Sequence, residues 1–212
     1  YEELKPIVTI EDALKKNNFL FEPRIIKKGD PQNKIIKSKN KLKGKFNTGS
    51  QEHFYLEGQV CLVIPQEDNN LTVYSSTQHP SETQQIVAKM LKQKSNSITV
   101  MVRRIGGGFG GKETNFMTAA ICALLSHKTG KPIKLRLDRD DDIIITGKRH
   151  DFYSEYEVGF NDNGKIEGLK LKLASRCGMS PDLSYAINER ALLHLDNAYY
   201  LSDLEVKNYL CK

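Results

Sequence analysis

The chain has 212 residues, 39% of them hydrophobic and 27% charged, a balance typical of a globular protein with a core of its own. Its 15 glycines and 7 prolines are too few for a collagen-like or low-complexity chain, and no apolar run approaches the roughly 18 residues of a membrane-spanning helix. We therefore expect no membrane association. The start, Tyr1 to Pro6, has no initiator Met and no signal sequence, so we expect a segment of a longer protein.

The net charge of +6 arises in the first 50 residues, which contain 12 Lys or Arg against 6 Asp or Glu. Between Lys34 and Lys45, six lysines follow one another at intervals of two or three residues without an acidic residue. No aromatic side chains alternate with them, as binding of single-stranded nucleic acid would require. We predict a solvated linker or an edge strand here, and no nucleic-acid partner.

The first half of the chain predicts a short helix and a β-hairpin. The helix is expected near residues 11–17, after an extended N-terminal piece. Strand-forming residues in 54–64 and 71–74 flank a polar turn and predict the hairpin. Ser81 as N-cap, with Gln84 three positions later, predicts that a helix of about three turns starts there.

The middle of the chain predicts a strand, a glycine-rich loop and a helix in succession. Residues 98–102 alternate as a half-buried strand does and lead directly into Gly106–Gly111. Residues 114–127 are apolar on most sides, which predicts a buried helix. A strand over 133–137 and an acidic turn follow.

The last third predicts a second hairpin and a final helix. The hairpin arms, 152–160 and 166–173, flank the turn residues Asp162-Asn163-Gly164. An amphipathic helix is expected over 183–195. This order of elements predicts an α+β fold with mixed, largely antiparallel sheets and packed helices, and not a doubly wound parallel sheet.

The four cysteines are far apart in the sequence and form no C-x-x-C pair, which argues against a zinc ribbon, an iron–sulfur loop or a redox dithiol in this segment. Each lies in an apolar or strand-like context, so we predict buried free thiols and a reducing compartment such as the cytosol. They are Cys61, Cys122, Cys177 and Cys211.

Five glycines in the six positions from Gly106 to Gly111 suggest unusual backbone dihedrals or close approach to a ligand. The loop fits G-x-G-x-x-G, but the acidic residue of a dinucleotide site is expected about 20 residues on and Asp138 lies later. It also fits G-x-x-x-x-G-K, but Glu113 stands where a magnesium-binding hydroxyl belongs. A tight turn serving only helix–sheet packing is a further alternative, although it does not explain Phe109.

Two blocks carry a family resemblance: GGGFGGKE at 106–113 and QEHFYLE at 51–57. Together they resemble the molybdopterin-binding portion of xanthine dehydrogenases and the related aldehyde oxidases, and the likeness covers nearly the whole chain. Residues 1–40 resemble the tail of the preceding hammerhead-type domain and a linker. Residues 41–212 resemble an incomplete first molybdopterin-binding domain of the xanthine oxidase type.

The resemblance implies roles for a few residues. Gln51 and Phe109 would lie at the molybdenum, and Gly108, Phe109 and Gly110 would contact the molybdopterin. Glu113, at the expected start of a buried helix, would hydrogen-bond a purine substrate; aldehyde oxidases have an apolar residue there. No catalytic residue is expected in this segment. The simpler interpretations are a helix N-terminal acid for Glu113 and a strand-edge polar residue for Gln51.

The resemblance also implies an enzyme that extends beyond this chain. Such enzymes of purine catabolism hydroxylate hypoxanthine or xanthine with oxygen from water and pass electrons through 2Fe-2S clusters to FAD and NAD, all carried on other parts of the protein. A homodimer in the cytoplasm, or in peroxisomes, is expected. The alternatives are an aldehyde oxidase-like enzyme, a truncated remnant without catalysis, and a nucleotide-binding module that uses the glycine loop for phosphate.

Some features depart from the family or fail as sites. Glu57-Gly58-Gln59 replaces a more usual Thr-His pair, which leaves the substrate open. The alternating acids of 138–142 lack the glycine and glutamate of a calcium loop and indicate a solvated turn or an acidic helix start. The five histidines form no pair with zinc-ligand spacing.

Overall fold

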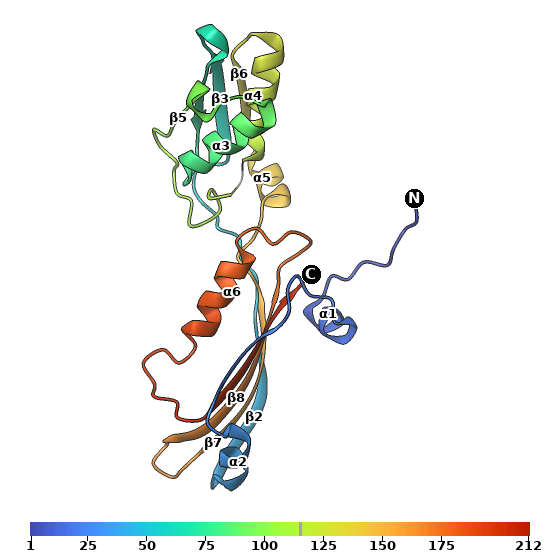
Figure 1. Ribbon diagram of the computed structural model, residues 1–212, viewed down its shortest axis with the longest axis vertical. Helices are drawn as coiled ribbons and strands as arrows, with labels where there is room; N and C mark the ends of the chain where they lie inside the picture. The colour runs from blue at the N-terminus through green and yellow to red at the C-terminus, as the bar shows by residue number, and fades with distance from the viewer. Residues whose placement is uncertain (115) are drawn as a thin grey trace. The chain divides into compact units, whose positions relative to one another are not determined.

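The computed structural model describes residues 1–114 and 116–212. The chain forms two compact units: unit 1 comprises Tyr1–Gln51 with His150–Lys212, and unit 2 comprises Glu52–Arg149. Figure 1 shows the elements of each. The domain boundary that the resemblance implies after residue 40 falls inside unit 1 and stays a prediction.

Unit 1 is built on a five-stranded mixed sheet in which β8 and β9 are parallel and the other neighbours antiparallel. The hairpin predicted for 152–173 is confirmed as β7 and β8. In spatial order the strands are β1 (Arg24–Lys28), β9 (Leu204–Cys211), β8 (Ile166–Arg176), β7 (Phe152–Phe160) and β2 (Asn40–Thr48).

Helices cover both faces of this sheet (Figure 1). On one face α1 (Ile10–Lys16) packs its buried Ile10 and Ala13 against Tyr153, Ala174 and Cys211. On the other face lies α6 (Ser184–Leu193), whose Asn188 carbonyl accepts a hydrogen bond from the buried Asn208 side chain at 3.0 Å. Both helices were predicted from the sequence at nearly these positions.

The lysine-rich stretch is half strand and half helix. Lys41, Lys43 and Lys45 lie on the edge strand β2, as predicted, but Lys34 and Lys37 lie on helix α2 (Pro31–Lys37), where we expected a linker or strand. The helix starts at Pro31 because Asp30 accepts a hydrogen bond from the backbone N–H of Asn33 at 3.2 Å.

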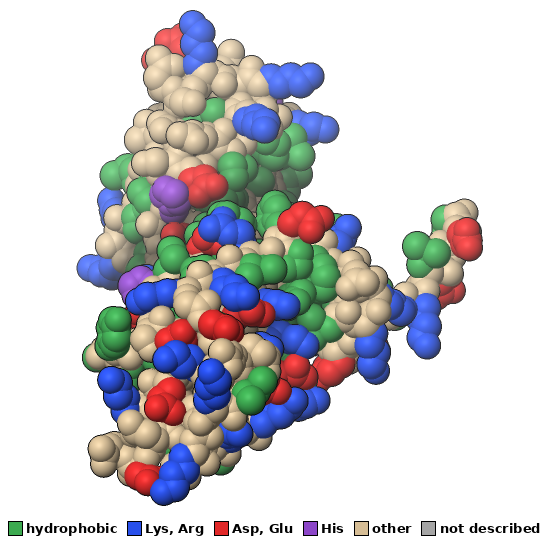
Figure 2. Space-filling view, turned by 60° about the horizontal axis from the view of Figure 1, so that its bottom comes forward, with side chains coloured by type: hydrophobic (Ala, Val, Ile, Leu, Met, Phe, Trp, Pro, Cys, Tyr) green, Lys and Arg blue, Asp and Glu red, His purple; other side chains and the backbone are tan. Residues whose placement is uncertain are grey.

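Between α1 and α2 the same sheet face is charged and hollowed, with a groove of about 550 Å³. One row of side chains alternates in sign across all five strands, so each charge faces an opposite charge on the neighbouring strand. Figure 2 shows basic and acidic side chains interspersed on the surface in view. The row is Lys27, Glu205, Lys170, Glu157 and Lys43.

Unit 2 is built on a four-stranded sheet, and its elements follow the predicted order. The β3–β4 hairpin and the strand at 98–101 are confirmed, although the first hairpin arm starts at Val60 and not at Phe54. In spatial order the strands are β5 (Ile98–Met101), β4 (Leu71–Ser75), β3 (Val60–Pro65) and β6 (Ile133–Arg136), with 3-10 turns η1 (Glu67–Asn69) and η2 (Ser95–Ser97).

Two helices cover one face of this sheet, α3 (Pro80–Leu91) and α4 (Met117–Thr129) (Figure 1). The core between helices and sheet contains only small and aliphatic side chains and two thiols. Its fully buried members are Cys61, Val63, Leu71, Val73, Val87, Ala88, Ile98, Ala119, Cys122 and Ala123.

Three sequence predictions about these helices were wrong in detail. Helix α3 begins at Pro80 with His79 as N-cap, so Ser81 lies inside the first turn, because proline at the first helical position sets the start. Helix α4 begins at Met117 and not at Thr114. Only one side of α4 is buried in this chain, and Ile121 and Leu125 remain about 40% exposed.

The acidic stretch after β6 forms helix α5 (Arg139–Ile145) and not a loop. Asp138 caps it by accepting a hydrogen bond from the N–H of Asp141 at 2.9 Å, which confirms the interpretation as an acidic helix start. Asp142 is only 1% exposed, so a solvated turn is wrong for this residue.

The cysteines are free thiols, as predicted; three are buried and Cys177 is half-buried. In the described ranges, no helix combines the length and apolar character needed to cross a bilayer.

Glu155 provides a pH-dependent test of the charged face. Hydrogen bonds from Lys172 and Tyr153 lower its pKa to about 2. A carboxyl group with a lowered folded-state pKa stabilises the fold above its ordinary value of 4.5, and this contribution disappears as the pH falls toward 2. We expect E155Q to lower the free energy of unfolding by about 0.5 to 1 kcal/mol at pH 7, and progressively less below pH 4.5, in urea denaturation.

Glu167 on β8 supplies the control, because it forms no ion pair within the described part of the chain. E167Q should leave stability unchanged. A loss for E155Q that is the same at pH 7 and at pH 3 would contradict the role given to its carboxylate.

Candidate functional site

The glycine loop lies where two parallel strands of unit 2 end. Strands β4 and β5 are parallel, so the segments that follow them leave the sheet at the same edge. β5 leads into Gly106–Gly111, and β4 leads into Ser76–His79. The topology therefore places Gln78 beside the glycines.

The loop backbone adopts conformations that explain the glycines. Gly106, Gly107 and Gly110 have φ values of 62°, 91° and 97°, which disfavour residues with a Cβ atom. Phe109 shares this region with φ 53°, and its side chain is 75% exposed. An aromatic residue held in this conformation with its ring outside the fold indicates a contact with something beyond this unit.

Lys112 anchors the end of the loop from inside. Its side chain is 1% exposed, and its Nζ donates to the carbonyl of Glu57 at 2.6 Å and to the carbonyl of Ile105. The ammonium also lies 4.6 Å from the ring centroid of Tyr55. Burial lowers the pKa of Lys112, an effect opposed by the charges of Glu57 and Asp142.

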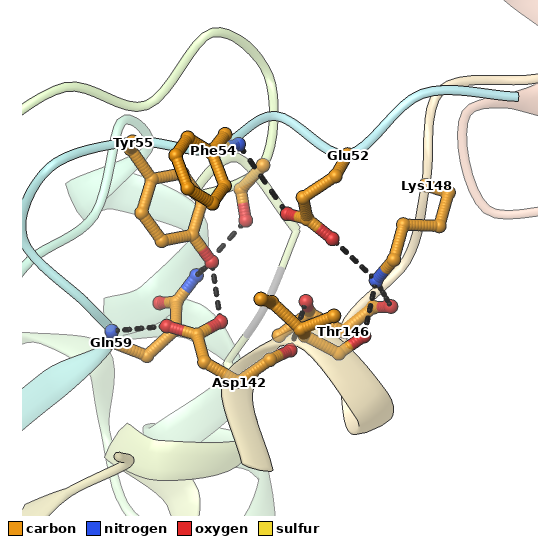
Figure 3. Close-up of polar contacts among 9 residues, drawn as sticks. Glu52, Phe54, Tyr55, Gln59, Asp142, Thr146 and Lys148 are labelled. Carbon is orange, nitrogen blue, oxygen red and sulfur yellow. Dashed lines mark hydrogen bonds and ion pairs between the residues drawn. The ribbon is translucent and has the colours of Figure 1, made fainter. Parts of the chain in front are cut away.

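A buried polar network joins the 55–59 segment to helix α5 (Figure 3). The hydroxyl of Tyr55 donates to Asp142 Oδ1 at 2.5 Å, and the backbone N–H of Gln59 donates to Oδ2 at 2.8 Å. Burial and the Asp142 carboxylate raise the pKa of Tyr55 to about 12. The Gln59 amide then donates to the carbonyl of Gly111 at 3.0 Å, so the network reaches the glycine loop.

A second set of contacts fixes the start of the same segment (Figure 3). Glu52 pairs with Lys148 at 2.9 Å, and Lys148 Nζ also donates to the carbonyls of Ile143 and Thr146 at 2.6 and 2.7 Å. Desolvation raises the pKa of Glu52, but the interactions with Lys148, the hydrogen bond from the N–H of Phe54 and the charge of His53 together outweigh it, so the net shift is downward. The 52–59 segment is thus tied at both ends to α5 and the residues that follow it.

The predicted residues of the loop have the following surroundings. Gly108 is buried, and the N–H of Gly110 donates to Gln78 at 3.0 Å. The N–H of Phe109 donates to no acceptor in the described part of the chain. Of the three cofactor-binding candidates, Gly108 is therefore buried, Gly110 is exposed but bound through its N–H to Gln78, and Phe109 projects outward.

Glu113 is half-buried and lies four residues before α4, so its placement at a helix start is wrong and a helix-dipole role does not apply. Its N–H donates to the Gly110 carbonyl at 3.4 Å and extends the turn of the loop. Among residues 1–114 and 116–212 its carboxylate has no hydrogen-bond or ion-pair partner, which leaves the carboxylate available to a ligand.

Gln51 is the last residue of unit 1, while Phe109 and Glu113 belong to unit 2. Gln51 is exposed and has a bridge partner. The expectation that its amide meets the loop stays a prediction.

Four residues that hold the loop were not predicted in that role: Gln59, Lys112 and Asp142, which are buried, and Gln78, which is exposed. A signal existed only for Lys112, because the G-x-x-x-x-G-K pattern singles it out for a phosphate. The structure contradicts that role, since Nζ is buried against two carbonyls and cannot reach a phosphate. The nucleotide-binding alternative therefore lacks the lysine ammonium that would contact the phosphate.

The residues present fit a cofactor that carries its own metal. In the described ranges, no group of three or more His, Cys, Asp or Glu side chains could hold a metal ion. The loop presents glycine backbone that a ligand can approach closely, the exposed ring of Phe109, and the Phe109 N–H, which has no acceptor among the described residues. These are contacts for the ligands of a bound cofactor, not for a bare cation.

Comparison with known proteins agrees with this arrangement. Residues 10–212 match the family model described as "Molybdopterin cofactor-binding domain". The chain is 45% identical over 214 residues to xanthine dehydrogenase/oxidase of Gallus gallus and 42% identical over 213 residues to xanthine dehydrogenase of Dictyostelium discoideum. In both cases the whole chain is covered, and it spans 16% of the relative.

Solved structures show the same fold at low sequence identity. The aldehyde oxidoreductase from Desulfovibrio desulfuricans matches 99% of the chain, and 24% of its own length, with a TM-score of 0.87 at 17% identity. The quinoline 2-oxidoreductase from Pseudomonas putida 86 matches all of the chain, and 28% of its own length, with a TM-score of 0.81 at 19% identity.

The fold and the family model thus define a molybdopterin cofactor-binding domain. The chain belongs to the molybdopterin cofactor-binding domain family, and its relatives at 36 to 45% identity are xanthine dehydrogenases. The predicted fold class and family are therefore confirmed.

Replacing Lys112 with Met tests the anchoring of the loop. The variant leaves the carbonyls of Glu57 and Ile105 without a donor in a buried site. We expect the free energy of local opening of residues 105–112 to fall by about 1 to 3 kcal/mol, measured by hydrogen exchange in the full-length protein. Exposed Lys131 supplies the control variant K131M, and equal exchange in K112M and K131M would contradict the anchoring role.

Proposed function

We propose that this chain forms part of the molybdenum cofactor and substrate pocket of a xanthine dehydrogenase-like hydroxylase acting on hypoxanthine or xanthine. The observation that carries the proposal is the glycine loop, which holds Phe109 outward. The N–H of Phe109 has no acceptor among the residues that the structure describes, while Gln78 and Gln59 bind Gly110 and Gly111. The coarser conclusion, a molybdopterin-binding domain, rests on family membership.

In this proposal the residues of the loop orient the cofactor. Phe109 would lie against the bound group and exclude water there, and the backbone of Gly108 to Gly110 would contact the cofactor. Gln51 contributes a neutral amide that can donate a hydrogen bond without adding charge. When bound, the molybdenum–molybdopterin group supplies a two-electron oxidation in which water provides the oxygen.

Glu113 is the proposed substrate contact. A half-buried carboxylate just beyond the loop, without a partner among residues 1–114 and 116–212, can accept a hydrogen bond from a ring N–H of a purine. An aldehyde offers no such donor, so the residue favours purines over aldehydes. No residue of this segment is assigned the catalytic proton transfer.

The rest of the enzyme lies outside these residues in our proposal. Because the chain spans 16% of its relatives, the 2Fe-2S clusters, FAD and NAD site, the catalytic base and the homodimer contacts belong to other domains of the same protein. We propose a cytoplasmic or peroxisomal location for that protein.

Metal analysis tests the cofactor assignment. We expect the purified full-length protein to contain molybdenum at close to one atom per polypeptide, and a F109G variant, which removes the outward ring, to retain less. The variant F21G, which removes a 42% exposed ring of unit 1, is the control. Full-length protein that is folded but free of molybdenum would refute the proposal.

Replacing Glu113 with Val tests substrate choice in the full-length enzyme. Loss of a charge-assisted hydrogen bond should lower kcat/KM for xanthine about 10- to 100-fold and leave oxidation of an aromatic aldehyde unchanged. The exposed Glu67 on η1 gives the control variant E67V. Equal losses for both substrates would remove Glu113 from substrate recognition.

A further inference from the structure

Gln78 lies outside the glycine block and binds it directly through hydrogen bonds. It follows β4 and approaches the loop from the neighbouring strand end. We propose that Gln78 is the positioning residue that fixes the conformation of the loop that presents Phe109. The consequence of this role for cofactor binding rests on the proposed function. The hydrogen bonds between Gln78 and the loop do not depend on it.

The side chain of Gln78 binds the loop at two amides. Its Oε1 accepts from the backbone N–H of Gly110 at 3.0 Å and from the N–H of Lys112 at 3.2 Å. Two donors converge on one atom, so the carboxamide must present its oxygen to the loop. We call these two hydrogen bonds the Gln78 clamp. Because Gly110 is the next residue after Phe109, the clamp holds the backbone immediately next to the outward ring.

The backbone around Gln78 strengthens the same attachment. Its N–H donates to the carbonyl of Lys112 at 2.8 Å, and the hydroxyl of buried Thr77 donates to that carbonyl at 3.3 Å. Residues 77–78 thus bind both the N–H and the C=O of Lys112. The loop cannot move relative to the end of β4 without breaking these bonds.

The absence of a side chain at Gly108 leaves room for the Gln78 side chain. A Cβ atom there would overlap Gln78 Oε1 and lie 2.8 Å from its Cδ, so the glutamine side chain occupies the space that any larger residue at 108 would need. The glycine is required by close approach here and not by its φ value. Gln78 and Gly108 form one packing unit.

The clamp also explains how an unfavourable backbone persists. Phe109 and Gly110 have φ values of 53° and 97°, and a phenylalanine in this region is strained. Without the Gln78 side chain the N–H groups of Gly110 and Lys112 lose their acceptor, while the bonds to the carbonyl and from the Nζ of Lys112 remain. The backbone next to Phe109 is then less restrained, and so is the direction of its ring.

The experiment uses three variants of the full-length protein. Q78L removes the acceptor at similar size, and Q78E keeps it, because a carboxylate oxygen accepts both bonds. The matched control is Q84L, since Gln84 binds backbone elsewhere in unit 2, through Nε2 to the Ile98 carbonyl at 2.7 Å.

Hydrogen exchange at residues 110 and 112 is the primary readout. We expect about 10- to 100-fold faster exchange of these amides in Q78L, and rates close to the parent in Q78E and Q84L. Unchanged exchange in Q78L, or equally fast exchange in Q78L and Q78E, would overturn the proposal.

Molybdenum content and kcat/KM per molybdenum are the secondary readouts. With the loop released in Q78L, both should fall, while Q84L should keep the values of the parent protein. If the parent protein binds no molybdenum, the proposed function fails, but the exchange test still decides the role of Gln78. If exchange supports the clamp while molybdenum content and kcat/KM stay unchanged, the clamp holds the loop without serving the cofactor, and its role toward the cofactor is refuted.

Discussion

The ammonium of Lys112 lies between the carbonyls of Glu57 and Ile105, at the point where two segments of unit 2 meet. Withdrawing an ammonium from water is expensive unless its hydrogen bonds are replaced, and here two carbonyls and the Tyr55 ring replace them. Because each carbonyl belongs to a different segment, the charge fixes their separation. The glycine loop begins and ends at this attachment, with residues 106–111 between its two ends.

The contacts that shape the loop come from neutral groups apart from Lys112. Gln59 and Gln78 bind the backbone of 110–112 through side-chain amides, while the Asp142 carboxylate is satisfied by Tyr55 and the N–H of Gln59. No carboxylate oxygen bonds to the 110–112 backbone in the described part of the chain. The loop can therefore approach an anionic ligand without meeting repulsion from the groups that hold it.

The sequence predicted what local pattern controls. The glycine block, the flanking strands and the 152–173 hairpin follow from residue type and period, and the structure has them where expected. The helix at Pro31–Lys37 also had a local signal, Asp30 before Pro31, which the regular lysines obscured. The start of α3 failed similarly, because Pro80 outweighs the capping-box pattern at Ser81.

Local sequence patterns could not predict the residues that hold the loop, because the roles of these residues depend on partners far away in the sequence. Tyr55 and Asp142 are 87 residues apart, and Gln78 and Gly110 are 32 apart. A charged residue looks solvated in a sequence until its partners are known, which is why Asp142 was assigned to a solvated turn or an acidic helix start and no buried role was predicted for Lys112. A glycine in a sequence indicates that another group approaches the backbone closely. Only the fold shows which side chain this is, and at Gly108 it is Gln78.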